Sequence, residues 1–198
     1  MYAYRSMTSK QKKQLTTLRK QLQRPLHAPP HFATDSLTYL LSAANYEHKP
    51  IMATAERRGE FEAKLLDFAI NHAGAEIFAW CILPNHWHLM APVTLSAFEA
   101  AISRLHNGTS TQWNREDLSA GRKVWYRFAD RRIRNERHYW ATLNYIHANP
   151  VHHNYTAKAD EWISSSLHSY LDQYGYEHMV RLWRDYPIHS MGKGWDQM

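Results

Sequence analysis

One stretch, residues 76–93, constrains the fold of this chain more than any other part of the sequence. Its first eight residues, EIFAWCIL, form a continuous apolar run of the kind that central β-strands have. Pro84 and Asn85 follow, and such a pair is typical of a turn. A second apolar segment then runs from His86 to Val93. We therefore predict a tight hairpin here, with two neighbouring strands.

The second of these strands begins with two histidines, His86 and His88, on either side of Trp87. Side chains alternate between the two faces of a strand, so the histidines share one face and Trp87 points to the other, into the core. Two neutral imidazoles on a rigid strand can hold a divalent metal and leave other coordination positions open. Such pairs also arise by chance in a chain with 14 histidines, so a third ligand and a nucleophile must come from elsewhere.

The composition indicates a folded domain with extensions. The chain has 198 residues, of which 44% are hydrophobic and 13% aromatic, and this is enough for a sizeable core. A formal net charge of +6 favours polyanionic partners. The sequence has no apolar run long enough to cross a membrane, and its single cysteine, Cys81, excludes an intramolecular disulfide framework. We therefore expect a cytoplasmic protein without a membrane partner.

The positive charge is concentrated at the N-terminal end. Residues 1–25 contain Lys and Arg but no carboxylate, and Pro25, Pro29 and Pro30 then interrupt any helix. This segment is either a solvated leader or an arm that neutralises phosphates. We predict a basic arm and linker over residues 1–30, a folded domain over 31–170 and a tail over 171–198.

Hydrophobic periodicity predicts alternating strands and helices between these extensions. We expect strands at 37–46, 76–83, 86–93 and 124–129, and helices at 58–72, after Ser96 as the N-cap, and at 135–149 with Asn135 as the cap. The polar stretch 106–114 is either a loop or a helix with an irregular middle. Residues 176–183 are compatible with a short helix that packs back on the domain.

The last predicted helix of the domain carries Tyr145 and Asn149, which are four residues apart and so share one face. A tyrosine hydroxyl is a poor nucleophile at its ordinary pKa, but beside a metal-bound phosphate it can attack phosphorus. The alternative is that Tyr145 only packs and Asn149 caps a helix that Pro150 ends or kinks. Three further histidines near this segment are interpreted as surface residues rather than ligands: His147, His152 and His153.

These motifs together resemble a known family. The chain is similar to the single-tyrosine HUH transposases, and within them to the REP-associated tyrosine transposases. The resemblance covers about residues 36–170 and rests on the following motifs in this order: His86-Trp87-His88, Tyr145-Ile146-His147-Ala148-Asn149-Pro150-Val151, Trp162, Ser164-Ser165-Ser166 and Tyr170.

The resemblance implies a ferredoxin-like α+β domain, the HUH nuclease fold, in which helices pack on one face of an antiparallel sheet. The histidine pair would lie on a central strand, and the helix with Tyr145 would lie across the edge of the sheet. By the same resemblance His86 and His88 bind the metal and Tyr145 is the nucleophile. Asn149 occupies a position at which related transposases have a glutamine ligand.

The implied reaction is cleavage and rejoining of single-stranded DNA through a 5′-phosphotyrosine intermediate. It would use Mg²⁺ or Mn²⁺ and no nucleotide cofactor, and its partner would be single-stranded or hairpin DNA. The protein would act as a monomer or a homodimer in the bacterial cytoplasm, in association with the nucleoid.

The candidate DNA contacts combine positive charge with aromatic surfaces. They comprise the basic arm, the stretch 162–170, in which Trp162 is alternatively a core anchor, and four arginines beside aromatic residues: Arg127, Arg131, Arg132 and Arg134.

Two other functions remain compatible with the sequence. One is a catalytically silent protein of the same fold that only binds DNA hairpins. The other is a metal-dependent hydrolase in which the histidine pair activates water and Tyr145 only packs.

Overall fold

A computed structural model describes residue 8, residues 37–188 and residue 191 of the chain. The predicted arm and linker, residues 1–30, therefore lie outside the described residues, apart from Thr8. Apart from Thr8, the described residues belong to the second of the two compact units of the chain, residues 33–198.

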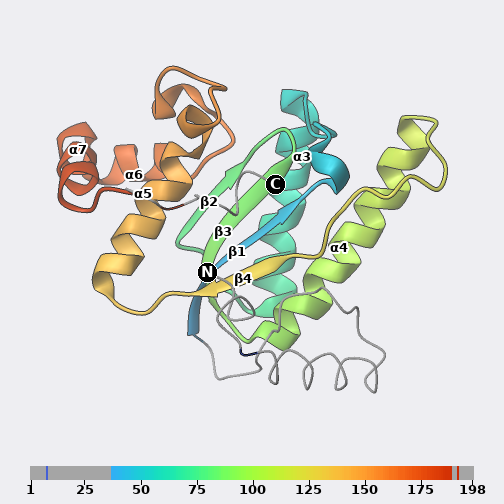
Figure 1. Cartoon of the computed structure of the whole chain (residues 1–198), viewed down its shortest axis with the longest axis horizontal. Helices are drawn as coiled ribbons and strands as arrows, with labels where there is room; N and C mark the ends of the chain where they lie inside the picture. The colour runs from blue at the N-terminus through green and yellow to red at the C-terminus, as the bar shows by residue number, and fades with distance from the viewer. Residues whose placement is uncertain (1–7, 9–36, 189–190, 192–198) are drawn as a thin grey trace. The chain divides into compact units, whose positions relative to one another are not determined.

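Four strands form one antiparallel sheet in the order β2-β3-β1-β4 (Figure 1). Their bounds are β1 Leu37–Ala44, β2 Ala79–Ile82, β3 His86–Val93 and β4 Ala129–Arg132. The predicted hairpin is confirmed, because β2 pairs with β3 and residues 83–85 connect them. β3 also pairs with β1, so the strand that begins with His86 is central in the sheet.

The sheet lies between two groups of helices (Figure 1). The longer helices are α3 Ala55–Asp67, α4 Leu95–Glu116, α5 Glu136–His152, α6 Leu167–Tyr174 and α7 Tyr176–Asp185. Three short helical segments complete the described elements: η1 Tyr46–His48, η2 Phe68–His72 and η3 Ala159–Glu161.

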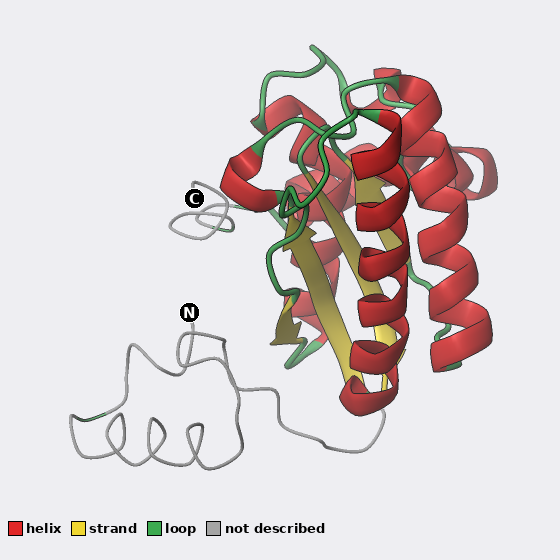
Figure 2. Ribbon diagram, turned by 90° about the vertical axis from the view of Figure 1, so that its right-hand side faces the viewer, coloured by secondary structure: helices red, strands yellow, loops and turns green. Residues whose placement is uncertain are grey.

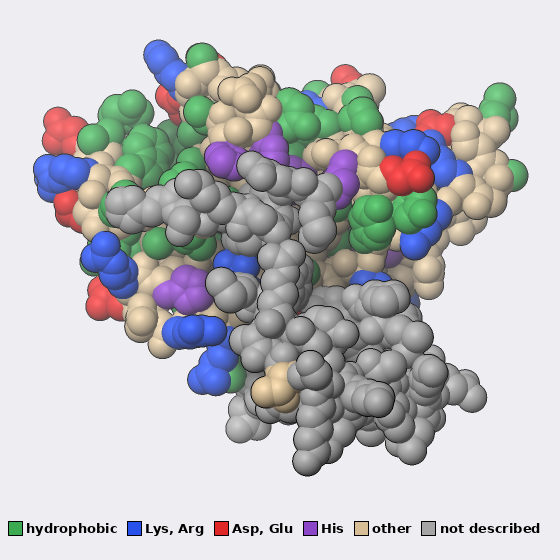
Figure 3. Space-filling view, viewed as in Figure 1, with side chains coloured by type: hydrophobic (Ala, Val, Ile, Leu, Met, Phe, Trp, Pro, Cys, Tyr) green, Lys and Arg blue, Asp and Glu red, His purple; other side chains and the backbone are tan. Residues whose placement is uncertain are grey.

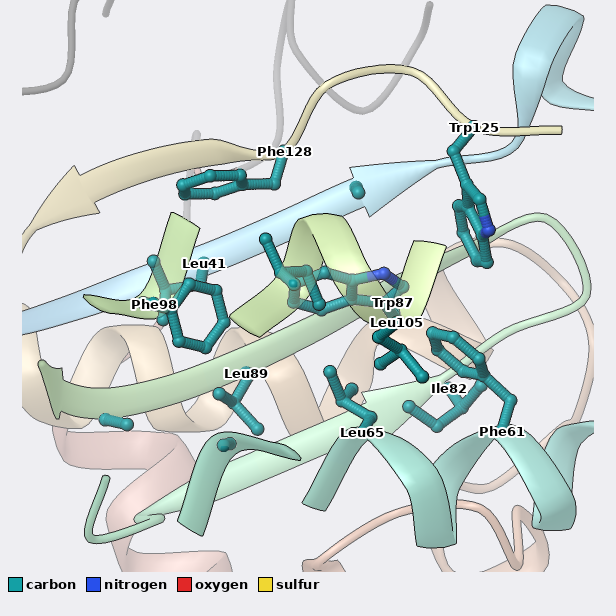
Figure 4. Packing of buried hydrophobic residues seen from close by; sticks show 14 of the residues in the cluster. Leu41, Phe61, Leu65, Ile82, Trp87, Leu89, Phe98, Leu105, Trp125 and Phe128 are labelled. Atoms are coloured by element: carbon teal, nitrogen blue, oxygen red, sulfur yellow. The ribbon is translucent and has the colours of Figure 1, made fainter. Parts of the chain in front are cut away.

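Helices α3 and α4 cover one face of the sheet, side by side (Figure 2). This interface is the larger apolar core, and aromatic residues from both helices meet the sheet there (Figure 4). Trp87 of β3 is fully buried in it, next to Leu41 of β1, Phe61 of α3 and Phe98 of α4. The predicted inward orientation of Trp87 is thus confirmed.

Helix α5 covers the opposite face, over β2 and β3, and α6 and α7 pack against it. A second apolar cluster joins Leu40 and Met90 of the sheet to Leu143 and Ile146 of α5 and Met179 of α7. The α+β antiparallel fold that the resemblance implied is confirmed, but the expected placement of helices on one face is wrong, because helices cover both faces of the sheet. The predicted helix at 176–183 also packs back as expected, whereas the predicted boundary at residue 170 falls inside α6.

Two local predictions about α4 differ in outcome. The polar stretch 106–114 is helical, because Thr109 and Trp113 are buried one turn apart and hydroxyls along the stretch bond to carbonyls of the preceding turn. The predicted cap at Ser96 is wrong: α4 begins at Leu95, after Thr94.

Two other boundaries were also wrong. The predicted strand at 124–129 contributes only an isolated bridge at Trp125 and the first residue of β4, because Val124, Trp125 and Phe128 are apolar in order to fill the core. Helix α5 starts at the predicted cap, Asn135, but continues past Pro150 to His152. Pro150 is itself buried, so packing of the last turn outweighs the loss of one helical hydrogen bond.

Candidate tyrosine and metal site

The two histidines lie at the start of β3 on the face that α5 covers. His86 is directly opposite Ala44 of β1, and His88 is opposite Ser42. Their ring centres are 5.0 Å apart, with the ring planes at 79° to one another. The predicted shared face is confirmed, and several histidine side chains gather near the middle of the face of the molecule shown in Figure 3.

Both nitrogen atoms of the His86 ring lie close to asparagine side-chain oxygens, and the neutral ring can donate a hydrogen bond to only one of them. Its Nδ1 is 2.7 Å from Oδ1 of Asn85, and its Nε2 is 3.1 Å from Oδ1 of Asn149 on α5. If Nδ1 carries the proton and donates to Asn85, Nε2 has a lone pair that faces the Asn149 oxygen. Asn85, predicted only as a turn residue, therefore orients the first histidine.

Tyr145 lies against the second histidine. The rings of His88 and Tyr145 are 5.3 Å apart, centre to centre, at an angle of 67°. Tyr145 and Asn149 both face the sheet, as the i, i+4 spacing predicted, and so α5 brings both to the pair on β3. The interpretation of Asn149 as a mere helix cap is wrong, because α5 ends at His152 and the Asn149 side chain is buried beside His86.

The four side chains are almost inaccessible to solvent. Relative exposure is 8% for His86, 1% for His88 and Tyr145, and 0% for Asn149. Burial lowers the pKa of His86 to about 3, and the neighbouring His153 adds to this effect. Burial also holds the pKa of His88 well below its ordinary value, with His86 contributing. Both rings are thus neutral at pH 7, the form in which imidazole binds metals.

This donor set fits a divalent metal ion. Among the described residues no group of three or more His, Cys, Asp or Glu side chains could hold one, so the ligands would have to include another residue type. The Asn149 amide oxygen, which lies 3.1 Å from His86 Nε2, would be this further ligand. Two imidazoles with an oxygen ligand suit Mn²⁺ better than Mg²⁺.

Helix α5 is fixed to the edge strand β2 by a buried polar network. Nε2 of His147 lies 2.9 Å from Oγ of Ser166, and this oxygen accepts a hydrogen bond of 2.9 Å from the backbone N–H of Trp80. His147 is fully buried, so its interpretation as a surface residue is wrong. The network holds the part of α5 that carries Tyr145, and it joins residues that are 19 or more positions apart in the sequence.

A third histidine adjoins the pair. The His153 ring lies 4.8 Å from that of His86, at the C-terminal end of α5, and is half-buried. His152 is exposed, as predicted. His153 was missed as a site residue because the helix was predicted to end near Pro150, so that the direction of the His153 side chain could not be predicted.

The four arginines predicted to bind DNA do not form one patch. Arg127 pairs with Glu99 at 2.6 Å, close to the end of β1 that faces His86. Arg131 and Arg132 are consecutive residues of β4 and point to opposite faces of the sheet. Arg131 is opposite Leu40 of β1, two residues before Ser42 and four before Ala44, so along the strand it lies about 7 Å from the level of His88 and about 13 Å from that of His86.

Arg134 lies just beyond β4 and is exposed. Trp162 is a core anchor, since it is 9% exposed and its Nε1 donates to the Ile82 carbonyl at 2.9 Å. Of the described helices, none combines the length and apolarity that a membrane span requires.

Comparisons with known proteins agree with this fold. No family model matches the chain. The REP-associated tyrosine transposase of Escherichia coli K12 is 32% identical over 95 residues, which are 47% of this chain and 54% of that protein, so the match spans about half the length of the relative. A solved structure of a REP-associated tyrosine transposase bound to a REP hairpin has the same fold, with a TM-score of 0.59 over 75% of this chain and 87% of the other, at 20% identity. In sequence over part of its length and in fold over most of it, the chain is similar to the REP-associated tyrosine transposases.

Proposed function

We propose that this protein binds hairpin-forming DNA and cleaves and rejoins its single-stranded part by means of Tyr145. The observation that carries the proposal is the meeting of Tyr145 and Asn149 from α5 with His86 and His88 from β3. The likeness to a transposase solved with a REP hairpin supports the choice of hairpin DNA as the partner.

In the proposed reaction the Tyr145 oxygen attacks the phosphorus of the scissile phosphodiester. A bond forms between this oxygen and phosphorus, the bond from phosphorus to the 3′-oxygen breaks, and the proton lost by the tyrosine balances the one gained by the 3′-hydroxyl. The phosphotyrosine link preserves the bond energy, so the released 3′-hydroxyl can reverse the step without a nucleotide cofactor.

The residues around Tyr145 have separate roles in this proposal. His86, His88 and Asn149 would hold the divalent metal, which when bound polarises the scissile phosphate. Asn85 fixes the ring of His86, and the network of His147 and Ser166 keeps α5 on β2. Each of these contacts limits the freedom of the attacking oxygen relative to the metal ligands.

The test is to incubate the purified protein with labelled single-stranded hairpin DNA from repeats beside its own gene, with Mn²⁺ or with a chelator. Denaturing gels would show a metal-dependent covalent adduct. We expect the adduct to fall by at least about 100-fold in Tyr145→Phe and His86→Ala, since each removes a participant in the reaction. Tyr176→Phe and His152→Ala are matched controls and should retain it, because both residues are exposed.

Other outcomes would select the alternatives. Tight hairpin binding without an adduct under any metal would identify a silent hairpin-binding protein. Cleavage that persists in Tyr145→Phe would identify a hydrolase in which water attacks.

A further inference from the structure

Two consecutive arginines at the start of α3 have different partners. Arg57 forms ion pairs with Glu116 at 3.0 Å and with Asp117 at 2.8 Å. Arg58 forms no ion pair with any carboxylate among the described residues, although it is partly buried. A partly buried cation without a carboxylate partner is uncommon in a structure and calls for an explanation.

Arg58 is nevertheless held in one position. Its guanidinium carbon lies 4.5 Å from the centre of the Trp162 ring. Its Nη1 donates to the carbonyls of Met52 at 3.2 Å and Ala53 at 2.6 Å. Its Nε has no hydrogen-bond partner among the described residues. Burial lowers the pKa of Arg58, yet an arginine keeps its charge at neutral pH. The result is a positive charge held in one orientation, with a buried Nε that no described residue satisfies.

This charge adjoins the turn that presents the histidine pair. The Met52 N–H donates to the carbonyl of Pro84 at 2.8 Å, and the indole of Trp162 donates to that of Ile82 at 2.9 Å. The two groups that position Arg58 are thus fastened to the last residue of β2 and to the β2–β3 connection, a few residues before His86.

A row of rings leads from Arg58 to the same site. The Tyr155 ring lies 5.6 Å from that of Trp162, the His153 ring lies 6.2 Å from that of Tyr155, and His153 adjoins His86 at 4.8 Å. Arg58 and Tyr155 both contact the Trp162 ring, and the positive charge of Arg58 opposes the rise that burial causes in the pKa of Tyr155. Tyr155 is 39% exposed, and part of its ring is therefore available to a ligand.

We propose that Arg58 and Tyr155 form a contact site for the single strand that extends from the cleavage position, with Arg58 on a backbone phosphate and Tyr155 stacked on a base. The inference rests on the proposed function, because it assigns a DNA strand to the neighbouring site. A guanidinium matches the geometry of phosphate oxygens, and exposed aromatic rings beside positive charge are the usual elements of single-strand binding. Hairpin pairing would not be read here, since duplex bases have no free faces to stack.

The test uses fluorescence anisotropy in the Tyr145→Phe background, so that binding is measured without reaction. Two labelled DNAs are compared, a hairpin with a single-stranded flank and the same hairpin with a blunt end. We expect Arg58→Ala to weaken binding of the flanked hairpin about 10-fold and to lower the slope of log affinity against log salt by about 0.7. Binding of the blunt hairpin should not change.

Two further variants separate the contact from a structural role of Arg58. Tyr155→Ala removes an exposed side chain and should weaken the flanked hairpin about 5-fold or more without changing the salt slope, because stacking involves no charge. Arg57→Ala is the matched control, since Arg57 is committed to Glu116 and Asp117, and should leave both affinities unchanged. Melting temperatures of all variants would identify any that do not fold.

Unchanged affinity for the flanked hairpin in folded Arg58→Ala and Tyr155→Ala would overturn this inference alone. Equal weakening by Arg57→Ala would also overturn it, since the effect would then come from net charge. Failure of the Tyr145→Phe protein to bind either DNA would overturn the proposed function together with the inference.

Discussion

The two faces of the sheet differ in what they bury. The face under α3 and α4 is an apolar core rich in aromatic residues, and His106 and Thr109 are the buried polar residues that α4 brings to it. The face under α5 buries a much larger polar set: His86, His88, Asn144, His147, Asn149 and Ser164 to Ser166. Burying polar groups costs free energy. The face under α3 and α4 therefore supplies most of the stability, and the face under α5 gives up some stability to bring the side chains of the candidate site together.

The largest effects are expected from changing two consecutive residues of β3 that face opposite ways, because one lies on the face that supplies stability and the other on the face that carries the site. Trp87→Ala should lower the free energy of unfolding by about 3–5 kcal/mol, because it leaves a large cavity in the core. His86→Ala should have a clearly smaller effect on stability and yet abolish adduct formation. Urea denaturation measures the first effect and the gel assay the second. A Trp87→Ala protein within about 1 kcal/mol of the wild type would show that this face is not the main source of stability.

A second prediction concerns the stability of the protein at low pH. It tests His106, a polar residue that is buried on the apolar face. His106 stacks on Trp125, with ring centres 4.3 Å apart, and burial lowers its pKa to about 3. The unfolded chain takes up the proton near pH 6.5 and the folded chain does not. The contribution of His106 is therefore intact above pH 6.5 and is lost as the pH falls towards 3, by about 1.4 kcal/mol per pH unit.

His106→Gln should flatten the pH dependence of stability by this amount between pH 6 and 4, as measured by urea denaturation at each pH. The amide can still accept the hydrogen bond that Trp87 Nε1 donates to His106 Nε2. An unchanged slope would mean that His106 is protonated in the folded protein and that this face is less dry than its burial indicates.

The smallest expected effect comes from the periphery of the same face. Asp117 binds Arg57 and Arg122 at 2.8 Å each, and the hydrogen bond from Arg57 is the main reason that the pKa of Asp117 falls to about 2. Because the folded pKa is the lower one, this contribution is present above about pH 4 and is lost as the pH falls towards 2.

Asp117→Asn should cost less than about 1 kcal/mol at pH 7, since the ion pairs are partly exposed to solvent and screened. Adduct formation should not change. Thermal denaturation at low and high salt would measure the difference, and a loss as large as that of Trp87→Ala would contradict the assignment of stability to apolar packing.

The sequence predicted those parts of the fold that have local signals. The alternation after His86 and the turn at Pro84 and Asn85 define the hairpin, and Asn135 marks the start of α5. The strand expected at 124–129 did not form at these positions. Trp125 and Phe128 are apolar because they fill the core, and composition alone does not distinguish such residues from residues of a paired strand.

The candidate site was predictable for similar reasons and to a similar extent. The spacing placed His86 and His88 on one face of a strand, and it placed Tyr145 and Asn149 on one face of a helix. Only the resemblance indicated that these two faces meet in one site. The support from Asn85 and Ser166, and the position of Arg58 beside the turn, depend on contacts between distant segments. No periodicity of one segment reports such contacts.

The alternation along β3 has one more consequence. A shift of this strand by one residue relative to β1 would turn Trp87 towards α5 and both histidines towards α3 and α4. Two imidazoles would then replace the aromatic side chain in the centre of the apolar core. The same register shift would therefore remove both the stabilising core packing and the candidate site. Every stably folded copy of the chain therefore presents both imidazoles to α5, His86 beside Asn149 and His88 beside Tyr145.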